Sequence, residues 1–259
     1  MTKIVTFCSF KGGTAKTSTC LHLGAALAKF EKKRVLLIDF DAQANLSAGL
    51  GLGVDHLDTM ARVLKEEKGV EEVIQQTMVK NLDIIPANIY LDGIESTAPI
   101  VGDLYGHERL RKSISHLDQY HYIFIDTPPS LGWLTQSALF AAHHSLICAI
   151  PEAYSILALN RLREYHEQIR ENHPLELLGV VLSFWSERGS TNEAFVDAIE
   201  LAFPAKLFPS KIRRDIAVSR AVLRGMPVFE LTSNSRAGED YKALSRDFLA
   251  RLKEYAHAE

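Results

Sequence analysis

The sequence KGGTAKTS at residues 11–18 lies between an apolar run, IVTFC at residues 4–8, and a segment whose small and apolar side chains recur at helical spacing as far as Ala28. A strand, a glycine-containing turn and a helix in this order form a loop whose N–H groups point inward, and the helix dipole adds positive potential. Lys16 has the spacing to reach the terminal phosphates of a nucleotide, and the hydroxyl of Thr17 has the spacing to bind magnesium. The stretch therefore predicts a phosphate-binding loop, and the simpler alternative is a Gly-Gly turn before a helix.

Length and composition restrict the class of protein. The 259 residues are enough for one large α/β domain, and 47% hydrophobic with 24% charged residues is typical of soluble globular proteins. The net charge of −3 means that any affinity for nucleic acid has to come from a local basic patch. The three cysteines, Cys8, Cys20 and Cys148, have no paired spacing, so they favour a reducing compartment over a disulfide framework. With no signal peptide and no membrane-length apolar run, we expect a cytoplasmic protein.

The lysine that opens residues 11–18 gives this loop a specific resemblance. The sequence resembles Lys-Gly-Gly-x-Gly-Lys-Thr, the variant loop of the ParA/Soj and MinD group of P-loop ATPases, with Ala15 as the departure. Alanine is tolerated there if residue 15 has helical φ. The resemblance implies that Lys11 crosses to the nucleotide of a second subunit. It also implies that ATP is bound by Lys11, Gly12, Gly13, Thr14, Ala15, Lys16, Thr17 and Ser18.

Two carboxylates, Asp39 and Asp41, follow the continuous apolar run at residues 35–38. Such a run predicts a strand buried on both faces of a parallel sheet, and the carboxyl ends of these strands form the edge where α/β proteins bind ligands. A solvated acidic turn is the simpler alternative. The sequence also resembles the family motif Asp-x-Asp-Pro-Gln, with Ala42 in place of proline. The resemblance implies that Asp41 activates the attacking water and that Asp39 supports the magnesium shell.

The sequence YIFIDTPPS at residues 122–130 is a second strand that ends in an aspartate. Its pattern is that of a Walker B strand, in which the aspartate holds magnesium through water next to the hydroxyl of the phosphate loop. Asp126 and Thr17 would then form the magnesium site together with Asp39. The alternative is an aspartate that caps a helix after a buried strand.

The segment 205–224 is basic in an otherwise acidic chain. It contains one acid, Asp215, and six bases: Lys206, Lys211, Arg213, Arg214, Arg220 and Arg224. Such a patch can neutralise phosphates without reading bases, and the alternative is a solvated helix face. Residues 208–213, FPSKIR, resemble the family's Ile-Pro-Arg-Asn-Val-Arg, although lysine replaces asparagine. The resemblance implies that Pro209 and Lys211 face adenine and that Arg213 and Arg188 contact DNA, with Arg214, Arg220 and Arg224 extending the DNA face.

Strands alternate with helices along the whole chain. This order predicts an α/β P-loop NTPase fold, a mainly parallel twisted sheet with helices on both faces. We expect a single domain of residues 1–259 without an N-terminal DNA-reading extension, and helices over 60–67 and 70–78. The resemblance implies a DNA-partition ATPase on the nucleoid. MgATP would clamp a homodimer that binds duplex DNA nonspecifically, and a ParB-like partner would stimulate hydrolysis and release.

Two alternatives remain open. A membrane-positioning ATPase of the MinD type would need a basic amphipathic tail, and residues 248–259 are mixed in charge. A nucleotide-gated regulator would have hydrolysis weakened by Ala15 and Ala42. Small-molecule P-loop ligases and iron-protein reductases have no support from a substrate motif or from the cysteines. The sequence leaves open whether a chromosome or a plasmid is moved.

Overall fold

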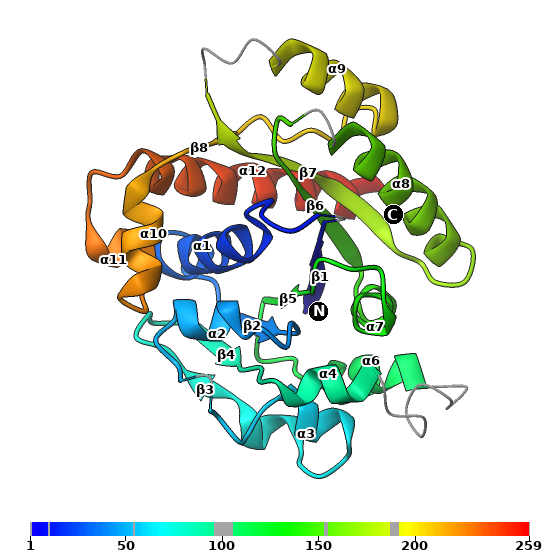
Figure 1. Cartoon of the computed structure of the whole chain (residues 1–259), viewed down its shortest axis with the longest axis vertical. Helices are drawn as coiled ribbons and strands as arrows, with labels where there is room; N and C mark the ends of the chain where they lie inside the picture. The colour runs from blue at the N-terminus through cyan, green and yellow to red at the C-terminus, as the bar shows by residue number, and fades with distance from the viewer. Residues whose placement is uncertain are drawn as a thin grey trace.

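The computed structural model describes residues 2–9, 11–53, 55–95, 106–152, 155–186 and 192–258. Within them lies an eight-stranded sheet with the order β3-β4-β2-β5-β1-β6-β7-β8, shown in Figure 1. The strands are β1 (Lys3–Cys8), β2 (Val35–Asp39), β3 (Gln75–Gln76), β4 (Leu82–Ile85), β5 (Tyr122–Asp126), β6 (His144–Ala149), β7 (Glu176–Trp185) and β8 (Ile212–Arg213). Neighbouring strands are parallel except β3 and β4. The predicted mainly parallel sheet is confirmed.

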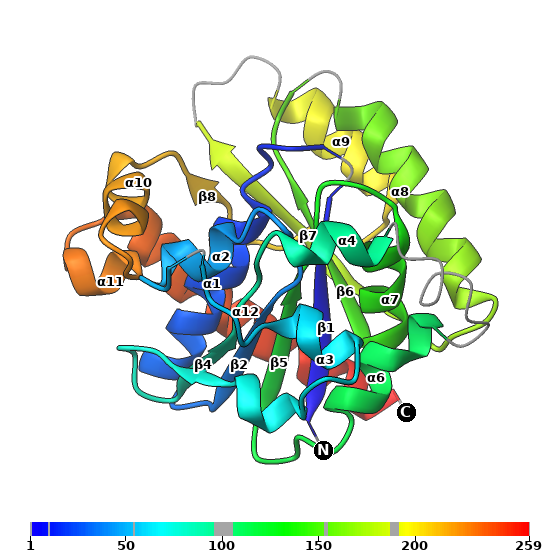
Figure 2. The same ribbon diagram turned by 60° about the horizontal axis from the view of Figure 1, so that its bottom comes forward.

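Helices cover both faces of this sheet, as the two views in Figures 1 and 2 show. The α-helices are α1 (Lys16–Lys29), α2 (Asn45–Gly49), α3 (Met60–Leu64), α4 (Tyr90–Glu95), α6 (Arg109–Ile114), α7 (Trp133–Ala141), α8 (Ser155–Arg170), α9 (Asn192–Ala202), α10 (Ile216–Leu223), α11 (Val228–Leu231) and α12 (Arg236–Ala258). Short 3-10 turns are η1 (Val70–Val73) and η2 (Gly106–Glu108). One core layer joins the sheet to α1 and α12, and the layers on the other face join it to α6, α7, α8 and α9.

The apolar strands supply side chains to both layers, because successive residues of a strand point to opposite faces. On β5, Phe124 packs beneath α1 and α12, whereas Ile123 and Ile125 pack on the opposite face. Phe124 contacts Phe7 of β1 at a ring-centroid distance of 5.0 Å and Phe248 of α12 at 5.4 Å. Burial on both faces explains why these strands appear as continuous apolar runs in the sequence.

The helix expected over residues 70–78 is wrong in its second half. The chain forms η1 and then turns into the edge strand β3, where Gln75 and Gln76 pair antiparallel with Ile84 and Asp83. Helix α3 also ends at Leu64, before the expected boundary. Pairing with a strand that lies later in the chain decides the conformation of residues 75–76, so local periodicity could not indicate it.

The strand register brings the acidic strand ends together. Asp39, at the end of β2, pairs with Asp126, at the end of β5. Asp126 also pairs with Phe7 of β1. β1 ends at the next residue, and the loop that leads into α1 follows it. The carboxyl ends of three central strands therefore meet at one edge, beside the predicted phosphate loop.

Candidate functional site

The loop between β1 and α1 has the backbone shape of an anion-binding turn. Gly13 has a φ of 79°, and Ala15, the residue before α1, has a φ of 61°. The helix then starts at Lys16, and the backbone N–H of Thr19 donates to the carbonyl of Ala15 at 2.8 Å. The N-terminus of a fourteen-residue helix thus faces the loop, where its dipole favours an anion.

Ala15 has a left-handed backbone, so the helical φ that the sequence-based prediction requires at this residue is not present. The sequence predicts that alanine is tolerated there with helical φ, but at a φ of 61° its Cβ approaches the following carbonyl oxygen. That conformation costs an L-residue about 1–2 kcal/mol, whereas glycine adopts it freely. The alanine therefore stores modest backbone strain at the entrance of α1.

Replacing this alanine tests the strain directly. Ala15→Gly should raise the free energy of unfolding by up to about 1 kcal/mol, because relief of the left-handed strain outweighs the greater freedom of glycine in the unfolded chain. Chemical denaturation measures the change. Ala26→Gly, in the interior of the same helix, is the matched control and should lower the free energy of unfolding by about 1 kcal/mol or more. Equal decreases in both variants would contradict the left-handed conformation at residue 15.

A pocket of about 690 Å³ opens in front of this loop. Its wall combines the loop with the segment after β2 and with the end of α10. The lining residues are Ser9, Lys11, Gly12, Gly13, Thr14, Ala15, Lys16, Thr17, Ser18, Leu21, Asp41, Gln43, Asn45, Ala48, Pro129, Val222 and Leu223. All eight residues predicted from the loop motif therefore face one cavity, together with Asp41. The hydroxyl of Thr14 in this wall is buried and has no hydrogen-bond partner among the described residues.

The end of α10 reaches this pocket because the backbone crosses very closely at two glycines. Gly51 follows α2, Gly225 follows α10, and both have positive φ. A Cβ on Gly225 would lie 2.4 Å from the Cα of Gly51, so no other residue fits there without displacing the backbone. The crossing holds the end of α10, with Val222 and Leu223, in the wall of the pocket.

Lys16 joins the loop to β5. Its side chain is 6% exposed, and its Nζ donates to Asp126 Oδ1 at 2.8 Å and to the carbonyl oxygen of Thr127. Burial by itself lowers the pKa of Lys16, but the attraction and hydrogen bond of Asp126 outweigh it and raise the pKa above its usual value. Lys16 is therefore a permanently charged group at the floor of the pocket.

Two buried carboxylates lie side by side next to this lysine. Asp39 and Asp126 are both fully buried, and Asp126 Oδ2 has no hydrogen-bond partner within the described parts of the chain. Burial, with the neighbouring charge of Asp126 as a smaller cause, raises the pKa of Asp39 to about 7. When both carboxylates are ionised, they carry one negative charge more than the buried lysine balances, and Asp126 Oδ2 has no described partner to stabilise it. This arrangement fits a divalent cation bound to oxygen ligands.

Among the described residues, no three His, Cys, Asp or Glu side chains are grouped so that they could hold a metal ion. Magnesium is commonly held by one or two carboxylates together with waters and substrate phosphates, so Asp39, Asp126 and the pocket residue Thr17 remain a suitable set for it.

Asp41 lies in the pocket wall beyond Asp39. It is 7% exposed, and its Oδ1 accepts a hydrogen bond from the backbone N–H of Gln43 at 3.0 Å. Burial raises the pKa of this carboxyl, although the charge of Lys16 opposes the effect. A carboxylate with a raised pKa is a stronger base than an exposed aspartate, which suits it to accept a proton from water.

Lys11 stands at the rim of the same pocket. Its Nζ donates to Glu152 Oε2 at 2.5 Å, and both side chains are about half exposed, at 42% and 52%. An exposed ion pair of this kind contributes about 0–1 kcal/mol. Lys11 can therefore leave Glu152 at little cost.

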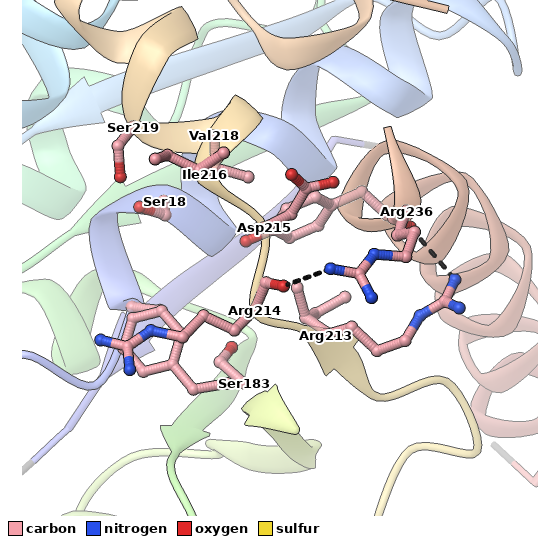
Figure 3. Close-up of a pocket in the computed structure, with 13 residues that line it drawn as sticks. Ser18, Ser183, Arg213, Arg214, Asp215, Ile216, Val218, Ser219 and Arg236 are labelled. Atoms are coloured by element: carbon pink, nitrogen blue, oxygen red, sulfur yellow. Dashed lines mark hydrogen bonds between the residues drawn. The ribbon is translucent and has the colours of Figure 1, made fainter. Parts of the chain in front are cut away.

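A second pocket of about 510 Å³ adjoins the first and shares Ala15 and Ser18 with it. Figure 3 shows that Arg213, Arg214 and Arg236 line it together with the start of α10. The hydroxyl of Ser183, at the end of β7, is fully buried in its wall and has no hydrogen-bond partner among the residues that the structure describes. The sequence did not predict this pocket. The one signal in the sequence is that Ser183 and Phe184 lie at the end of a predicted strand, and this does not indicate which other segments complete the wall.

Phe184 gives the second pocket an aromatic wall. Its φ is 54°, a conformation that a bulky residue adopts at a cost. The residue is 41% exposed, and the centroid of its ring lies 5.3 Å from the guanidinium carbon of Arg214. Pro209 and Lys211, the predicted adenine residues, are not among the residues that line either pocket. The Nζ of Lys211 instead lies 4.0 Å from the ring centroid of Trp185.

The predicted DNA-contacting arginines differ in their surroundings. Arg213 is held by Asp240, which accepts from its Nη2 at 2.7 Å and from its backbone N–H at 2.9 Å. Arg220 and Arg224 are exposed on α10 and at its end, and Arg214 precedes this helix beside Phe184. Arg188 lies outside the described residues. The structure therefore assigns Arg213 a contact within the fold and places three further arginines around α10.

Comparisons with known proteins agree with this geometry. Residues 2–177 match a family model described as an AAA domain. A ParA family protein of Chlamydia trachomatis serovar D is 53% identical over 252 residues, which cover 97% of this chain and 99% of that protein. The sporulation initiation inhibitor protein Soj of Bacillus subtilis is 34% identical over 254 residues, which cover 96% of this chain and 99% of Soj.

Solved structures share the fold. Apo McdA from Cyanothece superposes with a TM-score of 0.86 at 22% identity, covering 96% of this chain and all of that one. Cobyrinic acid a,c-diamide synthase from Mycobacterium smegmatis, with bound ADP and magnesium, superposes with a TM-score of 0.82 at 26% identity, covering 98% of this chain and 96% of that one.

Since the fold alone is shared by proteins with different described activities, the sequence relatives decide the family. They match this chain over nearly its whole length. The lysine-led loop and Asp41 line one pocket, and Lys16 of that loop contacts Asp126, the strand partner of Asp39. The chain belongs to the ParA family of partition proteins.

Proposed function

We propose that this protein is an ATP-dependent DNA-partition ATPase. The observation that carries the proposal is the meeting of Lys16, Asp39, Asp41 and Asp126 at one sheet edge, directly around the N-terminus of α1. Fixed positive charge, a helix N-terminus and buried carboxylates are the elements of phosphoryl transfer, in which positioning and charge stabilisation supply most of the catalysis.

The two adjoining pockets divide the work of nucleotide binding. The loop N–H groups and Lys16 bind the phosphates in the first pocket. The sugar and the base extend past Ala15 and Ser18 into the second pocket, where Phe184 and Arg214 offer a stacking surface. Pro209 and Lys211 precede Ile212, which lines that pocket, so their predicted contact with adenine would need the base to reach further along the same segment.

Thr17, Asp39 and Asp126 would hold magnesium, which when bound neutralises charge between the terminal phosphates. Lys16 donates to Asp126 in this conformation, so it has to exchange that carboxylate for phosphate oxygens when a nucleotide binds. Asp41 orients the attacking water and accepts its proton. Lys11 leaves the weak pair with Glu152 and places its charge on the nucleotide of a second subunit, so that ATP holds a homodimer together.

The arginines around α10 would bind duplex DNA through its phosphates. Two copies of the patch in a dimer raise affinity through multivalency, so dimerisation by ATP becomes the switch for DNA binding. Arg188 and Arg213 stay in the proposal as further contacts, although Arg213 would have to leave Asp240 to reach a phosphate. A ParB-like partner would stimulate hydrolysis and release the complex. No helix in the described part of the chain has the length and apolar character needed to cross a membrane.

Binding to nonspecific duplex DNA with ATP, with ADP and without nucleotide tests this function. We expect binding with ATP alone, weakening as salt rises. Absence of DNA binding in every state, with the nucleotide shown to be bound, would contradict the partition proposal and favour a nucleotide-gated regulator or a membrane-positioning ATPase.

The double variant Arg220→Ala/Arg224→Ala tests the DNA face. The variant should keep its ATPase activity and bind DNA more weakly, by the same factor for all sequences. The plot of log K against log salt should become less steep, by about 1 for each phosphate that is no longer neutralised. A salt titration measures the slope. Arg170→Ala is the matched control, because Arg170 pairs with Glu176 at the far end of α8. An unchanged slope in the double variant would place the DNA face elsewhere.

A further inference from the structure

Ser47 of α2 connects three segments at the floor of the nucleotide site. Its hydroxyl donates to Asp39 Oδ2 at 2.7 Å, and its backbone N–H donates to the same oxygen at 2.8 Å. The hydroxyl also accepts a hydrogen bond from the backbone N–H of Ala87, which follows β4, at 3.1 Å. The side chain is fully buried, so none of these bonds competes with water.

The two bonds to one oxygen fix how Asp39 is turned. With Oδ2 occupied twice, the carboxylate cannot rotate without breaking charge-assisted hydrogen bonds. Its other oxygen, Oδ1, accepts a long hydrogen bond, 3.3 Å from the backbone nitrogen of Asp41. Asp39 therefore presents Oδ1 toward Asp41, and its strand neighbour is Asp126.

We propose that Ser47 is a positioning residue that orients the Asp39 carboxylate for magnesium-assisted nucleotide binding. This inference rests on the proposed function, since it assigns Ser47 a task only if Asp39 supports a magnesium shell. Ser47 does not face the pocket, whereas Asn45 and Ala48 of the same short helix do. Ser47 acts through Asp39, and the hydrogen bond from the Ala87 N–H keeps the Ser47 hydroxyl in place.

The structure offers a matched control for removing a buried serine hydroxyl. Ser137 of α7 is also fully buried, but its hydroxyl has no hydrogen-bond partner within the described ranges. Ser47→Ala and Ser137→Ala thus each delete a buried hydroxyl oxygen. The Ser47 hydroxyl is hydrogen-bonded to Asp39 and Ala87, whereas the Ser137 hydroxyl has no hydrogen bond among the described residues. Ser47→Thr keeps a hydroxyl at residue 47.

The experiment measures the affinity for a fluorescent ADP analogue with magnesium and with EDTA, alongside thermal unfolding of each variant. For Ser47→Ala we expect affinity in EDTA close to that of the unsubstituted protein and a decrease of about tenfold with magnesium, as for removal of a hydrogen bond to a charged group. The magnesium concentration for half-saturation should rise by a similar factor. Ser47→Thr and Ser137→Ala should keep the magnesium response.

A merely structural serine would behave differently. Equal decreases of affinity with magnesium and with EDTA, or an unchanged magnesium response in Ser47→Ala, would overturn the positioning role while leaving the proposed function intact. Absence of nucleotide binding, or of any magnesium effect, in the unsubstituted protein would overturn the proposed function and this inference with it.

Discussion

Lys16→Ala should abolish detectable nucleotide binding. The substitution removes a buried cation that the structure places at the phosphate loop, and with it the charge-assisted hydrogen bonds to the terminal phosphates. It also leaves Asp126 buried without an ion-pair partner, which costs about 3–5 kcal/mol when one member of a buried pair is removed. Titration with a fluorescent ATP analogue measures binding, and thermal unfolding measures the decrease in stability.

A second variant separates these two effects. Lys16→Ala/Asp126→Asn removes the unpaired charge as well, so it should recover much of the stability while still failing to bind nucleotide. Lys29→Ala removes a lysine from the other end of α1, where it forms an exposed pair with Glu230, and should change neither quantity much. Tight ATP binding by a folded Lys16→Ala variant would move the phosphate site away from this loop.

Much of this site could be predicted because its elements are local or follow from strand direction. A strand, a glycine turn and a helix within residues 4–28 determine the loop by themselves. Asp39 and Asp126 are 87 residues apart, yet both end apolar runs, and parallel strands bring their carboxyl ends to one edge. Their place at one edge therefore follows from the sheet type, whereas their pairing depends on β2 and β5 being neighbours, which the sequence did not predict.

The parts that could not be predicted depend on contacts between distant segments. Nothing near Arg213 in the sequence indicates that Asp240 holds it, so the motif alone made it a DNA contact. The bond between Ser47 and Ala87 spans 40 residues and has no periodic signature. The left-handed φ of Ala15 is set by the loop as a whole, and alanine is a residue for which local preference predicts helix.

Asp41→Asn should uncouple nucleotide binding from hydrolysis. Asparagine keeps the shape and the oxygen that accepts from the Gln43 N–H, but it cannot take a proton from water. Removal of a general base lowers turnover by about 10²–10⁴-fold, whereas the phosphate contacts of Lys16 and the loop stay in place. ATP should therefore bind nearly as before, and the ATP-bound dimer should accumulate. Steady-state phosphate release and light scattering measure the two effects.

The environment of Asp41 adds a pH dependence to this prediction. Burial raises the pKa of its carboxyl, so protonation begins at a higher pH than for an exposed aspartate. Turnover should consequently fall as the pH drops through the raised pKa, because the base form disappears. Asp41→Asn should lose this part of the pH dependence and keep only the part that comes from protonation of Asp39. Asp118→Asn, at an exposed turn, is the control and should follow the unsubstituted protein. Normal turnover in Asp41→Asn would remove Asp41 from the hydrolytic step, and failure to bind ATP would make it a residue that holds the nucleotide rather than the water.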